Sequence, residues 1–278
     1  MISSPLISAP EVIPLLGQAV FLDARTGPDA IRAYATAHVA GAIRADLEND
    51  LSEEVGNPAE GGRHPLPSLG VWLARLAAWG VTPSTPVVVY DAAGGGMAAA
   101  RAWWMFHAVG HESLAVVDGG WQALREAGVS TDAEDSRARA AEPYPSKVDA
   151  WPIVDAAFVE HARTDPSWRV IDARAPERYE GRYEPLDPVA GHIPGAHNLY
   201  WRSQLNDSGV FDSPATLRDA YARILGDASS ERAVCYCGSG VTACHLLLAM
   251  HACGLSGAQL YVGSWSEWCR QKRPCATG

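Results

Sequence analysis

Four short segments occur twice along this chain, in the same order. The pairs are Phe21–Arg25 with Val170–Arg174, His38–Ala42 with His192–Ala196, Val88–Asp91 with Val234–Cys237, and Val117–Trp121 with Tyr261–Trp265. Two copies of one supersecondary plan, each about half of the chain, are the economical explanation of this order. A chain of 278 residues also has the length of two ordinary domains. The repeat therefore predicts two domains with a common fold.

Within each copy, short apolar runs alternate with helical patterns. Pro86–Tyr90 and Leu114–Val117 are typical of strands, and Val71–Trp79, followed by Gly80, is typical of a helix with a C-terminal stop. Ser8–Glu11 has the spacing of a capping box and predicts a helix start. Alternating strands and helices predict an α/β fold, in which each domain has a parallel-stranded sheet flanked by helices.

A polar segment separates the two copies. Thr131–Arg139 is rich in charged residues, and Glu142–Pro145 cannot continue a helix because of its prolines. We therefore expect an N-terminal domain at residues 1–135, a linker at 136–147 and a C-terminal domain at 148–278.

The composition excludes several classes of partner. The formal net charge is −10 and no basic run is present, which argues against nucleic acid. No apolar run has membrane-spanning length, and Met1–Pro5 lacks the features of a signal peptide. All six cysteines lie in the last part of the chain, a pattern that indicates a reducing compartment rather than a disulfide framework. We expect a cytoplasmic protein that binds neither nucleic acid nor a membrane.

Cys237 begins a loop between a strand-like run and a helical pattern. The loop continues as Gly238-Ser239-Gly240-Val241-Thr242, and no lysine or arginine occurs before Cys244. Its glycines allow the chain to turn so tightly that several N–H groups, together with a helix N-terminus, can face one sulfur atom. Such an environment favours the thiolate and predicts a nucleophile. Cys235-x-Cys237 is not a usual zinc spacing, so we expect no metal and no cofactor.

The two copies differ at this position. The first copy has Asp91 where the second has Cys237, and Asp91 precedes a longer glycine-rich loop without a thiol. We expect the first domain to keep the scaffold without the nucleophile.

These motifs resemble the two-domain rhodanese family of sulfurtransferases. The resemblance covers nearly the whole chain and is carried by the two Asp-Ala-Arg segments, the two His-x-x-Gly-Ala segments, Arg101–Phe106, Cys237–Ala243 and Gly263–Trp268. It implies tandem rhodanese-like domains, the first without the catalytic cysteine. It also implies ping-pong transfer of a sulfane sulfur from a small-molecule donor, through a persulfide on Cys237, to a thiol, thioredoxin or cyanide. The Cys237 loop is similar to that of the 3-mercaptopyruvate sulfurtransferase branch.

The resemblance also implies a set of site residues. Ser239 matches a catalytic serine that acts with a histidine and an acid, for which His64 and Glu48 are the candidates. Arg178 matches the arginine that binds the substrate. The 3-mercaptopyruvate branch usually has a second arginine before His-Ile-Pro-Gly, but Leu186 stands near that place, and Arg182 is the alternative. Gly238, Gly240, Val241 and Thr242 complete the substrate-binding loop.

The neutral loop also bears on the donor. Thiosulfate is a dianion and benefits from nearby cations, whereas a monocarboxylate such as 3-mercaptopyruvate needs fewer. The sequence therefore favours 3-mercaptopyruvate, with thiosulfate as the alternative donor.

Two other readings compete with the sulfurtransferase. A cysteine phosphatase requires arginine six residues after its cysteine, and Ala243 stands there. A tandem scaffold that only binds a partner has no need of Cys237. Both are disfavoured.

Several other residues are expected to be structural. We expect Asp172 and Arg174 to pair, His38 and His192 to bond backbone groups, and Trp265 and Trp268 to pack in a core. For Thr242, a cap on the following helix and a hydrogen bond to the sulfur are both open. Cys235 is either a core residue or a second thiol.

Overall fold

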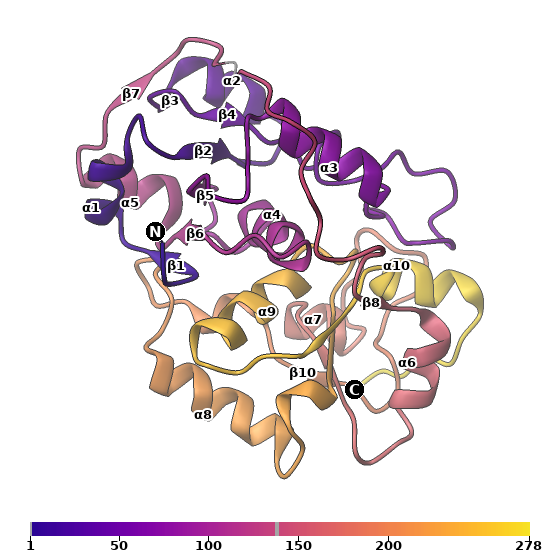
Figure 1. Ribbon diagram of the computed structural model, residues 1–278. Coiled ribbons are helices and arrows are strands. Elements are labelled where there is room, and N and C mark those ends of the chain that lie inside the picture. Colours follow the sequence, from indigo (N-terminus) through magenta and orange to yellow (C-terminus); the bar gives the residue numbers. More distant parts are fainter. Residues whose placement is uncertain (1, 137–138) are drawn as a thin grey trace. The chain divides into compact units, whose positions relative to one another are not determined.

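The chain folds into two compact units in the computed structural model, which describes residues 2–136 and 139–278 (Figure 1). Unit 1 contains the residues up to Glu53, Pro67–Trp151 and Asn206–Phe211. Unit 2 contains Glu54–Leu66, Pro152–Leu205 and Asp212–Gly278. Two short segments, 54–66 and 206–211, therefore belong to the unit built mainly from the other half of the chain. The predicted linker at 136–147 includes Arg137 and Ala138, which lie outside the described residues, and that boundary stays a prediction.

Unit 1 is built on a parallel sheet of five described strands, in the order β1-β6-β5-β2-β4, with a separate antiparallel pair of β3 and β7. Its elements are β1 (Leu6–Ile7), α1 (Ala9–Val12), β2 (Val20–Asp23), α2 (Ala30–Thr36), β3 (His38–Val39), β4 (Ile43–Arg44), α3 (Leu69–Ala78), β5 (Val87–Tyr90), α4 (Ala98–Ala108), β6 (Leu114–Val117), α5 (Gly120–Glu126) and β7 (Thr131–Asp132). A short 3₁₀ helix, η1 (Ile13–Leu15), follows α1.

Unit 2 contains the second five-stranded parallel sheet, in the order β10-β9-β11-β12-β8. Its elements are β8 (Ile153–Val154), α6 (Ala156–Ala162), β9 (Arg169–Asp172), α7 (Pro176–Tyr179), β10 (His197–Asn198), α8 (Pro214–Leu225), β11 (Ala233–Tyr236), α9 (Ala243–Ala252), β12 (Gln259–Tyr261) and α10 (Ser264–Trp268). The 3₁₀ helices are η2 (Trp201–Gln204), η3 (Ser230–Arg232) and η4 (Cys269–Gln271).

The strand register shows that the two sheets are copies of one plan. In unit 1, Asp23 of β2 is level with Tyr90 of β5, and in unit 2, Asp172 of β9 is level with Tyr236 of β11. Asp91 and Cys237 are the next residues after the two equivalent strands. The prediction of two α/β domains with parallel sheets is confirmed.

The local signals in the sequence also formed the expected elements. Helix α1 follows Ser8, whose backbone N–H donates to the Glu11 carboxylate at 3.0 Å, as in a capping box. Helix α3 ends before Gly80, which has a φ of +71°. Glycine can adopt this left-handed backbone conformation without a steric clash, and it therefore often ends a helix. The strands expected at 86–90 and 114–117 are β5 and β6.

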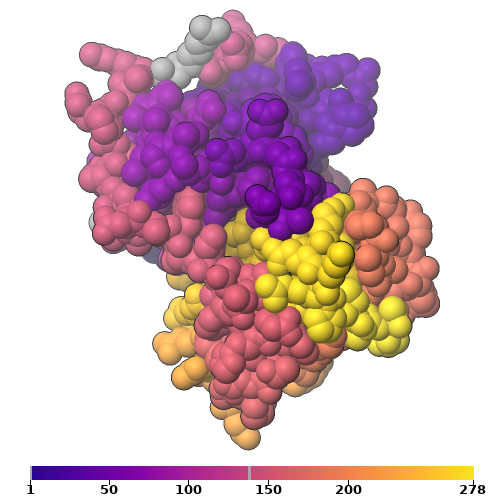
Figure 2. All heavy atoms as spheres, turned by 90° about the vertical axis from the view of Figure 1, so that its right-hand side faces the viewer, coloured from indigo at the N-terminus to yellow at the C-terminus, as the bar shows by residue number. Residues whose placement is uncertain are grey.

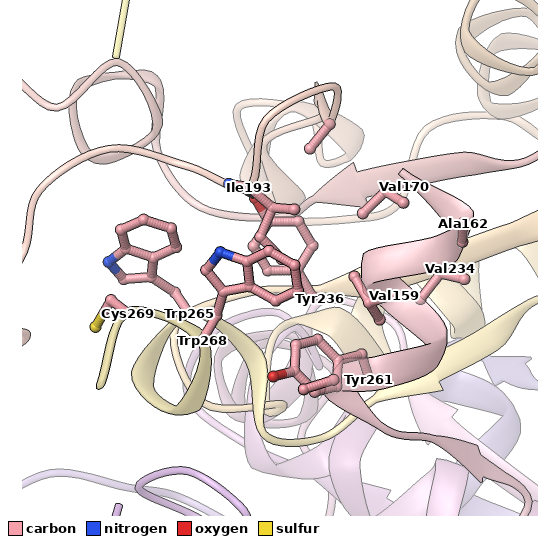
Figure 3. Packing of buried hydrophobic residues seen from close by; sticks show 12 residues of the cluster. Val159, Ala162, Val170, Ile193, Val234, Tyr236, Tyr261, Trp265, Trp268 and Cys269 are labelled. Atoms are coloured by element: carbon pink, nitrogen blue, oxygen red, sulfur yellow. Dashed lines mark hydrogen bonds between the residues drawn. The ribbon is translucent and has the colours of Figure 1, made fainter. Parts of the chain in front are cut away.

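One hydrophobic cluster of unit 2 lies on one face of its sheet. Strands place alternate side chains on opposite faces, so Val234 and Tyr236 of β11 point to the same side. There they pack with α6 and α10, and Figure 3 shows the rings of Trp265 and Trp268 rising from α10 beside Tyr236 and Ile193. Both tryptophans are fully buried, which confirms their packing role. Cys235 alternates to the other face, where α9 contacts β11.

A buried ion pair follows the second strand of each sheet. Arg174 Nη2 lies 2.6 Å from Asp172 Oδ2, and Arg25 Nη2 lies 2.6 Å from Asp23 Oδ2. The four side chains are no more than 6% exposed. Each guanidinium also lies over a tryptophan ring, Trp265 for Arg174 and Trp121 for Arg25. The expected pairing of Asp172 with Arg174 is confirmed, and unit 1 repeats it.

The histidines at the two Gly-Ala turns have equivalent structural roles. His38 Nδ1 lies 2.7 Å from the carbonyl of Tyr34, and His192 Nδ1 lies 2.8 Å from the carbonyl of Tyr179. Each imidazole also stacks on the ring of that same tyrosine. The expectation that these histidines bond backbone groups is confirmed.

The helices of the protein are short, and its C-terminal residues reach the surface. Among the residues that the structure describes, no helix combines the length and the apolar character needed to cross a membrane. The C-terminal residues of unit 2, yellow in Figure 2, are partly exposed and form part of its surface.

We predict that Asp172→Asn lowers the free energy of unfolding of unit 2 by about 3 kcal/mol, because it leaves the buried Arg174 without its counter-ion. Asp29→Asn, which removes an exposed ion pair with Arg32, should lower the free energy of unfolding by less than about 0.5 kcal/mol. Urea unfolding followed by tryptophan fluorescence measures both changes. Equal losses in the two variants would contradict the role assigned to burial.

Candidate active site

Cys237 lies directly after the carboxyl end of β11 and is 2% exposed. The first turn of α10 fixes its backbone. The N–H of Cys237 donates to Ser264 Oγ at 3.1 Å, and its carbonyl accepts from the N–H of Trp265 at 3.0 Å. The carbonyl of Gly238 accepts from the N–H of Ser266 at 3.0 Å. Packing of the tryptophans of α10 therefore also holds the cysteine in place.

The loop after Cys237 turns sharply into α9. Gly240 has a φ of +77°, a conformation that side chains disfavour, and Val241 is buried. Thr242 is the N-cap residue of α9, but its hydroxyl makes no capping hydrogen bond among the described residues. The cap is therefore not its role here, and the alternative of a bond to the sulfur stays a prediction. The N-terminus of a ten-residue helix at this loop favours negative charge there.

In the equivalent loop of unit 1, backbone N–H groups converge on a carboxylate. The carboxylate of Asp91 is fully buried and accepts four backbone N–H bonds of 2.8–3.2 Å, from Ala93, Gly95, Met97 and Ala99. Burial raises the pKa of the Asp91 carboxyl, and the four N–H bonds oppose that rise. Because Cys237 occupies the equivalent position, we expect loop N–H groups to stabilise its thiolate in the same manner.

Ser239 and His64 lie within hydrogen-bond distance. His64 Nδ1 is 2.7 Å from Ser239 Oγ, and the residue Ser239 is only 7% exposed. His64 reaches this place because segment 54–66 packs on α10, where the N–H of Gly61 donates to Glu267 Oε1 at 2.9 Å. The geometry fits a hydroxyl and an imidazole that exchange a proton, and their catalytic role stays a prediction.

Arg178 stands beside the cysteine loop. A Cβ atom on Gly238 would lie 3.3 Å from Arg178 Nη1, so the guanidinium faces the residue next to Cys237. Arg178 extends from α7 and binds the buried carboxylate of Glu184 through Nη2 at 2.7 Å and Nε at 3.1 Å. Its side chain is 18% exposed.

Two further predicted site residues are exposed. Arg182 is 61% exposed and its guanidinium pairs with Glu180, so its described contact is not with the loop. Glu48 belongs to unit 1, is exposed, and its backbone N–H donates to Asp46 Oδ1. Their roles in the site stay predictions.

Cys235 lies in the interior of unit 2. It is fully buried, and burial, reinforced by the neighbouring Cys244 and Cys237, raises the pKa of its thiol well above the ordinary value. A thiol with a raised pKa stays protonated at neutral pH and is a poor nucleophile. All six cysteines are free. Among residues 2–136 and 139–278, no group of three or more histidine, cysteine or acidic side chains is arranged to hold a metal ion.

Three residues near the loop were not identified from the sequence. The carboxylate of Asp187 is fully buried among Arg63, Arg178 and Arg270, at distances of 3.1, 3.5 and 2.7 Å. Arg63 directly precedes His64, and a Cβ atom on Gly238 would lie 3.0 Å from its Nη2. Arg63 could have been predicted as a site residue because a cation directly precedes the candidate histidine in the sequence. No sequence pattern distinguishes Asp187 or Arg270 from charged residues on the surface.

A family model decides the identity of the chain. The model of the rhodanese-like domain matches residues 8–127 and again residues 155–271. This chain belongs to the rhodanese family of sulfurtransferases, with two rhodanese-like domains in tandem. The resemblance seen in the sequence is confirmed.

Named relatives cover most of the chain. A Pseudomonas aeruginosa protein named probable 3-mercaptopyruvate sulfurtransferase is 41% identical over 89% of this chain and 87% of its own. The thiosulfate sulfurtransferase of Cricetulus griseus is 32% identical over 87% of this chain and 80% of its own. The solved structure of 3-mercaptopyruvate sulfurtransferase from Leishmania major superposes with a TM-score of 0.87 and 32% identity, covering 98% of this chain and 76% of that one.

We predict that iodoacetamide at pH 7.5 modifies Cys237 faster than Cys235, by about tenfold or more. Only the thiolate reacts, and burial raises the pKa of Cys235. Mass spectrometry of tryptic peptides after brief labelling can measure both rates. Faster labelling of Cys235 than of Cys237 would show that Cys237 is not the reactive thiol.

Proposed function

We propose that this protein transfers a sulfane sulfur from 3-mercaptopyruvate to a thiol, thioredoxin or cyanide acceptor through a persulfide on Cys237. The observation that carries the proposal is the position of a cysteine at the head of a turn into a helix N-terminus, with the guanidinium of Arg178 against the adjacent Gly238. This arrangement supports a nucleophile beside a carboxylate receptor. The relatives are sulfurtransferases, which favours this reading over a tandem scaffold that only binds a partner.

The first half-reaction joins the two sulfur atoms. The Cys237 thiolate attacks the donor sulfur, an S–S bond forms, and the donor C–S bond breaks. Its electron pair goes to the donor carbon, which leaves as the enolate of pyruvate. The proton that the donor thiol loses must reach this carbon, and Ser239 with His64 is placed to pass it. The products are pyruvate and an anionic persulfide held by the loop N–H groups.

The second half-reaction restores the enzyme. An acceptor thiolate attacks the outer sulfur of the persulfide, the S–S bond to Cys237 breaks, and the Cys237 thiolate returns. We propose that the acceptor is a small thiol or a thioredoxin-type protein. We also propose a cytoplasmic location, since the six free cysteines fit a reducing compartment.

The charges beside the loop favour a donor with one negative charge. Among the ion pairs of the described residues, Arg63, Arg174, Arg178 and Arg270 are linked to three carboxylates, Asp172, Glu184 and Asp187. One net positive charge remains, which matches a monocarboxylate better than the thiosulfate dianion. Thiosulfate is the second candidate donor, because a relative that carries that name covers most of the chain.

We predict that wild-type protein treated with 3-mercaptopyruvate alone gains one sulfur atom on Cys237. Cys237→Ser should gain none and should lose sulfur transfer to cyanide. Intact mass and thiocyanate formation are the measurements. Unchanged transfer by Cys237→Ser would overturn the proposal, whereas faster transfer from thiosulfate than from 3-mercaptopyruvate would overturn only the choice of donor.

We predict that Ser239→Ala lowers kcat with 3-mercaptopyruvate by about a hundredfold, while the rate with thiosulfate changes much less. The reason is that pyruvate enolate needs a proton as it leaves, whereas sulfite does not. Steady-state rates with both donors test this, and His64→Gln should have the same effect without a further loss in the double variant. Equal losses with both donors would contradict the proton-transfer role and indicate a structural one.

A further inference from the structure

Two guanidinium groups flank the residue next to Cys237. A Cβ atom on Gly238 would lie 3.0 Å from Arg63 Nη2, and 3.3 Å and 3.4 Å from Arg178 Nη1 and Nη2. The two arginines come from segments more than a hundred residues apart, yet both belong to unit 2. A side chain at position 238 would therefore meet both guanidinium groups, and the glycine leaves them room beside the Cys237 loop.

The position of Arg63 is fixed by its backbone. Its N–H donates to Ser266 Oγ at 3.1 Å, and Gln271 Nε2 donates to the carbonyl of Ala59 at 2.8 Å. At Gly62, which has a φ of +81°, a Cβ atom would lie 2.5 Å from the carbonyl oxygen of Gly263. The segment therefore fits tightly against the start of α10, the same turn that holds the backbone of Cys237.

Asp187 orients the guanidinium of Arg63 without covering it. Its buried carboxylate accepts from Arg63 Nε at 3.1 Å and from Nη2 at 3.3 Å. No side chain or carbonyl of the described residues accepts a bond from Nη1, and the Arg63 side chain is 22% exposed. A guanidinium that is oriented by a buried anion and still has a donor available is suited to bind a carboxylate.

We propose that Arg63 is the second arginine of the carboxylate site and acts with Arg178 on the donor. This assignment rests on the proposed function and deepens it. The resemblance to the 3-mercaptopyruvate branch implied a second arginine near position 186. This chain has Leu186 there, an apolar residue that is 56% exposed. Arg63 supplies the missing cation from a different part of the chain, so a clamp for one carboxylate is complete without an arginine at position 186.

The proposal is tested by measuring both pyruvate binding and the kinetics of sulfur transfer. Pyruvate is titrated calorimetrically into Cys237→Ser protein with and without Arg63→Gln, and donor kinetics are measured in the single variant. We expect Arg63→Gln to weaken pyruvate binding and raise KM for 3-mercaptopyruvate by about tenfold or more, with a much smaller change in kcat. Arg63→Lys should give a partial loss, because lysine keeps the charge but lacks the fork.

Controls separate a direct contact from misfolding. Arg202→Gln, which removes an exposed arginine of unit 2, should change neither KM nor the melting temperature. Leu186→Arg in the Arg63→Gln background should restore part of the lost affinity, which a folding defect would not allow. If Arg63→Gln leaves pyruvate affinity and KM within twofold of the parent, the assignment of Arg63 is wrong. Absence of any persulfide on wild-type Cys237 would instead refute the proposed function.

Discussion

The guanidinium of Arg174 connects three parts of unit 2: the end of β9, the loop after α7 and the residue before His192. It binds Asp172 at 2.6 Å, the carbonyl of Gly191 at 2.7 Å and Glu184 at 3.4 Å, and it lies over the ring of Trp265. The N–H of Trp265 in turn holds the carbonyl of Cys237. Glu184 also binds Arg178, so both the candidate nucleophile and the candidate carboxylate receptor depend on this one buried cation. Its burial is tolerated because every contact is to a carboxylate, a carbonyl or an aromatic ring.

The two units place different residues at the head of the same loop scaffold. In unit 1 the Asp91 carboxylate occupies the loop and takes four N–H bonds, so that loop is filled by its own side chain. In unit 2 the equivalent residue is Cys237, the sulfur that we propose accepts and releases a second sulfur atom. The surrounding architecture is the same, since Trp121 donates to the carbonyl of Asp91 as Trp265 does to that of Cys237. The difference in chemistry between the units therefore comes from the first residue of the loop and from the charged side chains around it.

Local features of the site were predictable because they depend on neighbours in sequence. The strand before Cys237, the glycine turn and the helix after it follow from periodicity and from glycine conformation. The pairing of Asp172 with Arg174 was also predictable, since only Ala173 separates them and the Asp-Ala-Arg motif occurs twice. The cluster around Asp187 was not, because Arg63, Arg178 and Arg270 approach it from distant parts of the chain. In the sequence, a buried carboxylate that binds three arginines looks the same as an exposed one.

The repeat, the α/β class and the family were determined by the sequence alone, because each is encoded in short segments whose order is enough to define it, and the sequence also predicted Cys237 as the nucleophile. Only the tertiary structure decided which arginines stand beside Cys237. It brought segment 54–66 into unit 2, set His64 2.7 Å from Ser239, placed Arg63 against Gly238 and left Arg182 on the surface with Glu180. The physical reason is that long charged side chains act several ångströms from their own backbone, and their positions follow from the buried partners that folding supplies.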